Sequence, residues 1–335
     1  MRDPRPTPPL SDEQLESARD LADRALSGER RAIARAISLI EDADPRAREI
    51  VRLLYPHTGR ARLVGLTGPP GVGKSTLLSG LVHVCRQRGL TVGVVSVDPS
   101  SPFTQGAVLG DRIRLTDHFL DPDVFIRSMG TRGHLGGLSE TALQAALVLD
   151  AAGKDVVFLE TVGVGQSEVE IATIAETVVL ALMPGSGDSI QALKAGVMEI
   201  PDIIVVNKKD HPSADVTLNE VRSILALSDR DRDWDPPLLA TNATTGEGVA
   251  ELWERITEHR EHLQVHGLLD QRRGQSLEKE VLALTRHEVE RILAGRSGSD
   301  PALAEILRQV RERTLDPLSA AGSILRDVLG IPPER

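Results

Sequence analysis

Short apolar runs alternate with amphipathic stretches over the middle of the chain, from about residue 62 to residue 260. The runs are almost continuously aliphatic and lie at residues 63–67, 91–98, 124–129, 156–160, 177–183, 202–207 and 237–241. Such runs are typical of strands that are buried on both faces, and the amphipathic stretches between them predict crossover helices. The pattern therefore predicts an α/β fold with a mostly parallel central sheet flanked by helices.

The residues before this region have the apolar periodicity of helices. Ser11 and Gln14 form a capping-box pair at the start of the first helix, and a third helix covers roughly residues 45–55. The first helix has the apolar positions Leu15, Ala18, Ala22, Ala25 and Leu26, and the second has Ile33, Ala36, Ile37 and Ile40. The proline-rich residues 1–10 predict a disordered tail.

The last 70 residues again predict helices. The pairs Asp300-Pro301 and Asp316-Pro317 are typical of a helix cap followed by a first-turn proline. The helices that they begin have apolar stripes at Leu303, Ile306, Leu307 and Val310, and at Leu318, Ala321, Leu325 and Val328. We therefore divide the chain into a helical N-terminal extension (1–60), a central α/β domain (61–265) and a C-terminal helical segment (266–335).

The composition excludes several classes of protein. Of 335 residues, 40% are hydrophobic and 26% are charged, which is ordinary for a globular protein. No run approaches the ~20 apolar residues of a membrane span, and the N-terminus has no signal-peptide pattern, so we expect a cytoplasmic protein without a membrane partner. The net charge of −10 argues against nucleic-acid binding. The single cysteine, Cys85, excludes an intrachain disulfide and a cysteine-based zinc site.

The strongest motif is the sequence GPPGVGKS, which follows the first predicted strand and precedes an amphipathic helix. It fits the P-loop pattern G-x-x-x-x-G-K-[ST], whose glycines let the backbone wrap a phosphate with its N–H groups inward. Lys74 would neutralise charge on the β- and γ-phosphates, and the Ser75 hydroxyl would hold Mg²⁺. The predicted nucleotide contacts are Gly68, Pro69, Pro70, Gly71, Val72, Gly73, Lys74, Ser75 and Thr76.

A second motif predicts that the base is guanine. Residues 207–210 read N-K-K-D at the end of an apolar run, which resembles the base-reading motif of GTPases. The carboxylate of Asp210 can accept hydrogen bonds from guanine N1 and N2, whereas it would repel the acceptor on the corresponding edge of adenine. Residues 242–244 lie where GTPases place a second guanine loop. The predicted contacts are Asn207, Lys208, Asp210, Asn242, Ala243 and Thr244, and the predicted ligands are GTP and GDP.

A third group of residues predicts a Mg²⁺ site and a switch. Glu160 ends a predicted strand and can order Mg²⁺ and its waters, while the backbone N–H of Gly163 can reach the γ-phosphate. Asp98 and Asp111 are further candidates for the metal site, although the residues alone are equally compatible with turns or helix caps. The predicted metal residues are therefore Ser75, Asp98, Asp111 and Glu160.

The order of these motifs resembles one known family. The segments GPPGVGKST, SVDPSSPFTQGAVLGDRIRL, FIRSMGTRGHLGGLS, ETVGVGQSE, PGSGDSIQALKAG and NKKD are similar to those of the methylmalonyl-CoA mutase-associated GTPases (MeaB/ArgK type, SIMIBI class) over residues 61–262. The resemblance implies a homodimeric G-protein chaperone of adenosylcobalamin-dependent acyl-CoA mutases. Such a chaperone gates cofactor delivery and protects or reactivates the mutase.

The resemblance also implies roles for particular residues. Asp98, Asp111 and Glu160 become metal-site and switch residues, and Lys194 becomes the candidate for signalling to the mutase or being activated by it. The catalytic candidates are then Lys74, Glu160 and Lys194. Residues 61–265 become a GTPase domain and residues 266–335 a dimerisation arm. Gln105 stands where the family usually has glycine. We expect slow intrinsic hydrolysis of GTP that a partner stimulates.

Four alternatives remain open at this point. A GTPase that delivers nickel or zinc needs histidine clusters or cysteine pairs, whereas the nine histidines are scattered. A P-loop kinase of a small molecule would not need the N-K-K-D motif. A scaffold that binds nucleotide without hydrolysing it would not need Lys74, Ser75 and Glu160 together. The C-terminal helices, for their part, could cap the central domain instead of forming a dimer.

Overall fold

The computed structural model describes residues 10–98, 112–130, 137–161, 174–185, 201–227, 233–296 and 300–331. The chain divides into two compact units. The larger unit is Leu10–Glu280, and the smaller one contains the residues from Val281 onward.

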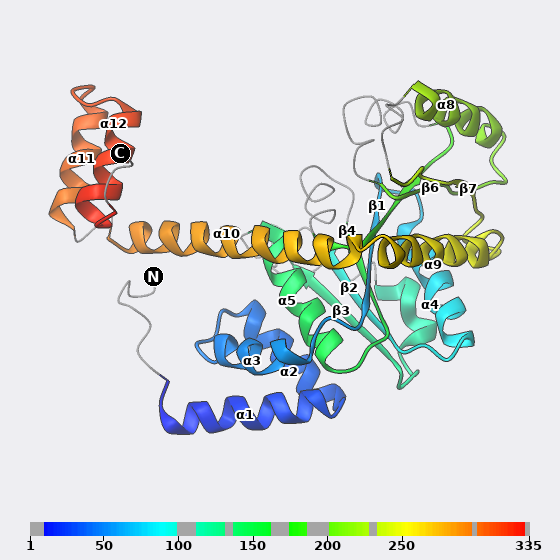
Figure 1. Cartoon of the computed structure of the whole chain (residues 1–335), viewed down its shortest axis with the longest axis horizontal. Coiled ribbons are helices and arrows are strands. Elements are labelled where there is room, and N and C mark those ends of the chain that lie inside the picture. The colour runs from blue at the N-terminus through cyan, green and yellow to red at the C-terminus, as the bar shows by residue number, and fades with distance from the viewer. Residues whose placement is uncertain are drawn as a thin grey trace. The chain divides into compact units, whose positions relative to one another are not determined.

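Within the described residues, the larger unit contains a sheet of seven strands in the order β3-β2-β4-β1-β5-β6-β7 (Figure 1). All of the pairings between neighbouring strands are parallel. The strands are β1 (Arg62–Thr67), β2 (Val92–Asp98), β3 (Val124–Gly130), β4 (Val156–Thr161), β5 (Thr177–Leu182), β6 (Ile203–Val206) and β7 (Leu238–Ala240). Each predicted apolar run matches one of these strands to within one residue at either end, so the predicted α/β fold with a parallel sheet is confirmed.

Helices cover both faces of the sheet, which explains why the strands are apolar throughout. In β4, Val156 and Phe158 pack in one cluster with α4 (Lys74–Gln87) and α9 (Val249–Val265). The alternate residues Val157 and Leu159 pack on the other side with α5 (Gly137–Ala151). At β5 and β6, the face away from α4 and α9 packs against α8 (Ala214–Leu227). A strand in the middle of such a sandwich has no polar face.

The N-terminal helices extend the layer that contains α5. They are α1 (Asp12–Leu26), α2 (Arg30–Glu41) and α3 (Ala47–Leu54), followed by a short 3-10 turn at Tyr55–His57, and Figure 1 shows them beside α5. The predicted capping box is confirmed, because Ser11 Oγ accepts from the Gln14 N–H and Gln14 Oε1 accepts from the Ser11 N–H. The predicted apolar positions of the first two helices lie in one cluster with the sheet and α5, except Leu15, which is only partly buried.

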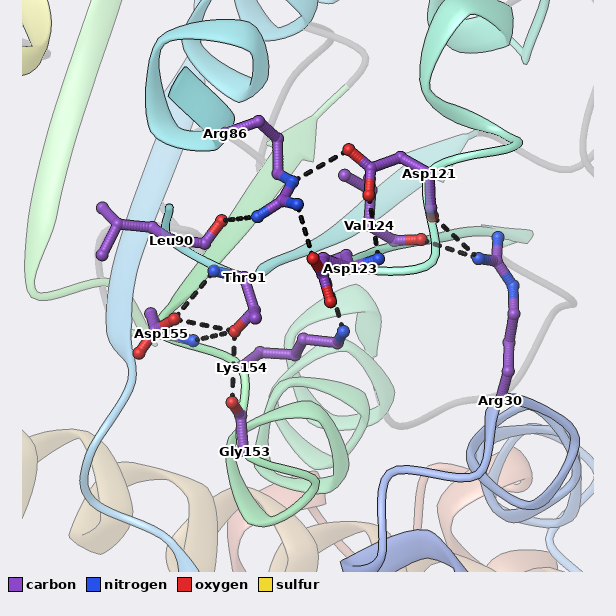
Figure 2. A network of polar contacts seen from close by, with 10 residues as sticks. All are labelled: Arg30, Arg86, Leu90, Thr91, Asp121, Asp123, Val124, Gly153, Lys154 and Asp155. Carbon is purple, nitrogen blue, oxygen red and sulfur yellow. Dashed lines mark hydrogen bonds and ion pairs between the residues drawn. The ribbon is translucent and has the colours of Figure 1, made fainter. Parts of the chain in front are cut away.

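A polar network closes the edge of the sheet where β2, β3 and β4 begin (Figure 2). Arg86, at the end of α4, donates to the carboxylates of Asp121 and Asp123 and to the Leu90 carbonyl oxygen. Lys154 donates to the backbone oxygen of Asp123, and its burial lowers the pKa of its ammonium group. The 3-10 helix Arg112–His118 lies between Leu90 and Asp121 in the chain. These contacts fix the amino ends of the strands, opposite the ends that carry the motifs.

The smaller unit is helical. It contains the end of α10 (Leu268–Arg296), then α11 (Pro301–Arg311), α12 (Pro317–Ser323) and a π-helical turn at Ile324–Val328. Both predicted aspartate caps are present: Asp300 Oδ1 accepts from the N–H groups of Ala302 and Leu303, and Asp316 Oδ1 accepts from those of Leu318 and Ser319. The first predicted stripe faces the core of this unit, where Leu303 and Ile306 are buried.

The second predicted stripe is wrong at three positions, because Ala321 is exposed as well as Leu318 and Leu325. Leu318 is 87% exposed and Leu325 is 44% exposed, while Ala320 and Val328 are buried. Within α12 the buried residue is Ala320, so Leu318 and Ala321 do not lie on the side that faces the core. After Ser323 the helix continues as a π turn, in which the Leu329 N–H donates to the Ile324 carbonyl oxygen. A π turn holds more residues than an α turn, so the buried positions recur every four residues instead of every 3.6.

In the part of the chain that the structure describes, no helix is both long enough and apolar enough to cross a bilayer.

Candidate functional site

The P-loop leaves β1 and enters α4 in a conformation that depends on glycine. Gly68, Gly71 and Gly73 have φ values of 142°, 76° and 96°. A Cβ atom on Gly68 would lie 2.2 Å from the Ala181 carbonyl oxygen, and one on Gly73 would lie 2.7 Å from Asn207 Nδ2. Both positions therefore exclude a side chain, because backbone or buried side-chain atoms already occupy that space. The loop ends at the first turn of α4, whose N–H groups favour an anion.

Lys74 and Ser75 are the first two residues of α4, and both are buried. The Lys74 ammonium donates to the carbonyl oxygens of Gly68 and Pro69, at 2.7 Å and 3.1 Å. The cation therefore lies over the loop that would wrap the phosphates. Val72 is also buried, whereas Pro70 and Gly71 are exposed and Thr76 is partly buried.

Glu160, at the end of β4, is bound by hydroxyl groups from two other elements. Ser75 Oγ donates to Glu160 Oε1 at 2.7 Å, and Ser96 Oγ donates to Glu160 Oε2 at 2.9 Å. All three side chains are buried. Hydroxyl and carboxylate oxygens beside a P-loop are the ligands that Mg²⁺ prefers, so the pair Ser75 and Glu160 fits the predicted metal site.

The sequence motifs did not point to Ser96. It lies in the middle of β2, directly opposite Glu160 in the pairing of β2 with β4. A serine within an apolar strand has no motif of its own. The available signal was its spacing, since Ser96 is two residues before Asp98 and alternate residues share a face of a strand. Asp98 ends β2, where it pairs with Gly130; its side chain lies outside the described part of the structure.

Asn207 connects the P-loop to the two predicted guanine loops. Its Nδ2 donates to the Val72 carbonyl oxygen at 2.8 Å, and its Oδ1 accepts from Thr241 Oγ1 and from the Ala243 N–H. Asn207 is only 2% exposed. Its side chain therefore holds the loops that follow β1, β6 and β7 together. Thr241 is a second residue that the sequence reasoning missed.

Lys208 and Asp210 lie on the exposed side of the same loop. Lys208 has a φ of 58°, and its ammonium donates to the Gly71 carbonyl oxygen at 2.9 Å. Asp210 Oδ1 accepts from Asn242 Nδ2 at 3.0 Å, so the second guanine loop orients the carboxylate that is predicted to read the base. Asn242 Oδ1 in turn accepts from the Thr244 N–H at 3.1 Å, which stabilises a turn.

The structure thus brings together the P-loop, Ser75 with Glu160, and the loops at residues 207–210 and 242–244. They follow strands β1, β4, β6 and β7 at the carboxyl edge of the sheet, where open α/β sheets bind their ligands. Three predicted residues, Asp111, Gly163 and Lys194, lie outside the described residues, and so does Gln105.

Two observations concern other kinds of metal site. Among the described residues, no group of three or more His, Cys, Asp and Glu side chains is arranged to hold a metal ion. Cys85 lies in the core between α4 and the sheet, and burial raises the pKa of its thiol to about 12. A thiol with such a pKa stays protonated at neutral pH and is therefore a poor metal ligand.

Comparisons with known proteins point to one family. The profile of the family described as methylmalonyl-CoA mutase-associated GTPase MeaB matches residues 33–297. A protein of Pyrococcus abyssi that carries a GTPase name is 50% identical over 93% of this chain and 97% of its own length. The GTPase ArgK of Escherichia coli is 36% identical over 88% of this chain and 91% of its own length. The methylmalonic aciduria type A homolog of Mus musculus, a mitochondrial protein, is 33% identical over 79% of this chain and 68% of its own length.

The fold has a solved counterpart. The crystal structure of a LAO/AO transport system kinase has a TM-score of 0.70 to this chain at 28% identity, and the similarity covers 96% of this chain and 99% of that one. The family profile, the relatives and this fold lead to one conclusion: the chain belongs to the methylmalonyl-CoA mutase-associated GTPases, the MeaB family of P-loop GTPases.

Proposed function

We propose that this GTPase is a Mg²⁺-dependent chaperone of an adenosylcobalamin-dependent acyl-CoA mutase of the methylmalonyl-CoA mutase type. In this role it gates loading of the cofactor and protects or reactivates the mutase. The observation that carries the proposal is the convergence of the P-loop, Glu160 and the loop of Asp210 at one edge of the sheet, in a chain whose family profile spans residues 33–297. The mutase-related names of the family and of the mouse relative support the choice of partner.

The proposed chemistry is hydrolysis of GTP to GDP and phosphate through positioning and charge stabilisation. The backbone N–H groups of the loop at residues 68–76, in which Pro69 and Pro70 have none, bind the β-phosphate, and the Lys74 ammonium exchanges the carbonyl oxygens of Gly68 and Pro69 for phosphate oxygens. Ser75 and Glu160 hold Mg²⁺, with Asp98 and Asp111 as further metal and switch residues. When bound, the cation neutralises phosphate charge. The Gly163 N–H contacts the γ-phosphate, so its loop responds to hydrolysis.

Guanine selectivity arises from Asp210. Its carboxylate accepts from the N1–H and the exocyclic amine of guanine, and Asn242 holds it in orientation. Adenine has an acceptor at N1, so it meets repulsion at the same position. Asn207 and Lys208 act by keeping this loop against the P-loop, while Ala243 and Thr244 complete the edge of the base site.

We further propose a homodimer. In this view residues 1–60 are an N-terminal extension, residues 61–265 the GTPase domain and residues 266–335 the dimerisation arm. The exposed side chains of Leu318 and Leu325 support this arrangement, because a second copy of the arm would bury them. The negative net charge supports a protein that does not bind nucleic acid, and we place the protein in the cytoplasm.

The test is to measure GTP turnover while the cobalamin-dependent mutases of the same cell are added one at a time. We expect one mutase to raise turnover by about tenfold, which corresponds to about 1.4 kcal/mol in the barrier. A rate that stays constant with every mutase would contradict the chaperone role and leave the GTPase activity intact.

Lys194 provides a second test of the same proposal. If Lys194 signals to the mutase, Lys194→Ala should lower the ratio of mutase-stimulated to basal turnover towards one. The exposed Lys209, which forms a surface ion pair with Glu247, offers a control lysine, and Lys209→Ala should leave that ratio unchanged. If Lys194→Ala and the unsubstituted protein had the same ratio of stimulated to basal turnover, Lys194 would have no role in signalling to the mutase.

A further inference from the structure

We propose that Ser96 is a positioning residue that holds the Glu160 carboxylate for the Mg²⁺ ion. The proposal deepens the function proposed above and rests on it, because it concerns the same metal site. Ser96 is not part of the P-loop or of the guanine loops, and its hydroxyl acts on the site only through Glu160.

The geometry that carries the proposal is a buried carboxylate held from two sides. Ser75 binds Oε1 from the first turn of α4, and Ser96 binds Oε2 from the middle of β2. Glu160 is 6% exposed and Ser96 is 4% exposed. A buried carboxylate needs strong donors, and hydrogen bonds from hydroxyl groups to a charged oxygen are among the stronger ones.

The two serines differ in how firmly their positions are fixed. Ser75 follows the P-loop, so its position is tied to the loop that receives the nucleotide. Ser96 lies opposite Glu160 in a parallel pairing, and β2 pairs with β3 on its other side. The sheet therefore fixes the position of Ser96 independently of the P-loop. We infer that Ser96 keeps the carboxylate in orientation when the nucleotide and the cation are bound.

The Ser96 contact leaves the carboxylate able to serve a cation. The two oxygens of a carboxylate offer about four lone-pair positions, and the Ser96 hydroxyl uses one of them. Partners of this kind, which orient a group that serves a metal, commonly change metal affinity by 10–100-fold when they are removed. The proposal therefore predicts a change in Mg²⁺ affinity that is separate from any change in stability.

The experiment measures how strongly the protein retains a fluorescent GDP analogue as free Mg²⁺ is varied. We expect the Mg²⁺ concentration for half-maximal retention to rise about tenfold in Ser96→Ala. Ser96→Thr, which keeps the hydroxyl, should retain the Mg²⁺ dependence of the unsubstituted protein. The readout is binding, so it does not depend on hydrolysis.

Thr177→Val is the matched control. Thr177 is a buried residue whose hydroxyl bonds to His259 Nδ1, in a strand that begins at the opposite edge of the sheet. This variant should lower the melting temperature without changing the Mg²⁺ dependence. Thermal unfolding without nucleotide shows whether each variant is folded.

The outcomes separate this inference from the proposed function. An unchanged Mg²⁺ dependence in Ser96→Ala, or an equal shift in Thr177→Val, would overturn the role of Ser96 while the metal site stands. The role of Ser96 would also be overturned if Ser96→Thr needed as much Mg²⁺ as Ser96→Ala for half-maximal retention of the GDP analogue. If the unsubstituted protein retained GDP equally well without Mg²⁺, the proposed metal site itself would fail, and the role of Ser96 with it.

Discussion

Asn207 illustrates how single residues build this site. Its amide group bonds to the P-loop, to Thr241 and to the backbone of Ala243, and it is buried. Each of these partners would be left without its bond if the side chain were removed, and buried polar groups are costly to leave unpaired. The residue therefore contributes to nucleotide binding by fixing the positions of three loops.

Gly68 provides a prediction at the same scale. In Gly68→Ala the added Cβ would meet the Ala181 carbonyl oxygen at 2.2 Å, in a backbone conformation with a φ of 142°. The loop must move away from β5, so we expect the affinity for GDP to fall by about tenfold or more, or about 1.4 kcal/mol. Isothermal titration of GDP in the presence of Mg²⁺ measures this loss.

Gly89→Ala is the control for backbone strain alone. Gly89 also has a positive φ, of 75°, but a Cβ atom there meets nothing within 4 Å. We expect this variant to lose about 1 kcal/mol of stability and to keep its GDP affinity. Equal GDP affinities for Gly68→Ala and Gly89→Ala would show that the close approach to Ala181 has no role.

At the scale of elements, the helices α9 and α10 bind the amino ends of β5 and β6 through two buried acids. Arg272 donates two hydrogen bonds to the Asp202 carboxylate, and Arg273 donates to Glu176. Burial alone would raise the pKa of Asp202, but the hydrogen bond with His259 and the Arg272 charge outweigh it and lower the pKa. Burial raises the pKa of Glu176 despite the charges of Arg260 and Arg273.

These two shifts predict opposite dependences of stability on pH. The folded pKa of Asp202 lies below its ordinary value of 3.8, so its contribution is complete above that pH and is lost as the pH falls through the folded value. The folded pKa of Glu176 lies above 4.5, so its contribution is complete below that pH and is lost as the pH rises through the folded value.

The measurement is urea unfolding of Asp202→Asn and Glu176→Gln between pH 3 and pH 7. We expect Asp202→Asn to cost about 1–3 kcal/mol at pH 7, because the partly exposed Arg272 loses its charged partner. That difference from the unsubstituted protein should narrow below about pH 4. The unsubstituted protein should lose stability relative to Glu176→Gln as the pH rises above about 4.5. If the free energy of unfolding changed with pH in the same way in both variants, the assigned pKa shifts of Asp202 and Glu176 would be contradicted.

The sequence predicted those elements whose signals are local. Seven apolar runs gave the seven described strands, and Ser11, Asp300 and Asp316 gave three helix caps, because the interactions of a cap lie within four residues. The P-loop and the N-K-K-D loop were predictable for the same reason. The sequence did not reveal the roles of Ser96 and Thr241 or the pairs of Glu176 with Arg260 and Arg273. The partners in these contacts are 34 to 97 residues apart in the chain. The stripe that includes Leu318 failed because Ala320 is the residue of α12 that faces the core, and because the π turn that follows changes the helical period.

At the scale of the whole molecule, the smaller unit has a core of its own and leaves large apolar side chains exposed. Leu303, Ile306, Ala320 and Val328 form that core. Leu318 is 87% exposed, and the surface of this unit also includes Val281, Leu282, Leu325 and Ile331. The proposed dimer would cover some of these side chains.

Leu318→Asp tests whether this surface forms the proposed dimer. We expect the unsubstituted protein to have a mass in solution of twice the 36.2 kDa of the chain, and the variant to shift towards a single chain. Light scattering after size-exclusion chromatography measures both. Val216→Asp, at an exposed position of α8, should leave the mass unchanged. A single-chain mass for the unsubstituted protein would contradict the dimer.

The central claim is that the loops at the carboxyl edge of the sheet form a guanine nucleotide site, and Asp210→Asn tests it most directly. Xanthine has an oxygen where guanine has its exocyclic amine, so an asparagine amide can donate to xanthine where the aspartate accepted from guanine. Titration of GDP and XDP should show that the unsubstituted protein prefers GDP by about 100-fold, or about 2.7 kcal/mol, and that the variant prefers XDP. A GDP affinity that Asp210→Asn leaves unchanged would contradict the account.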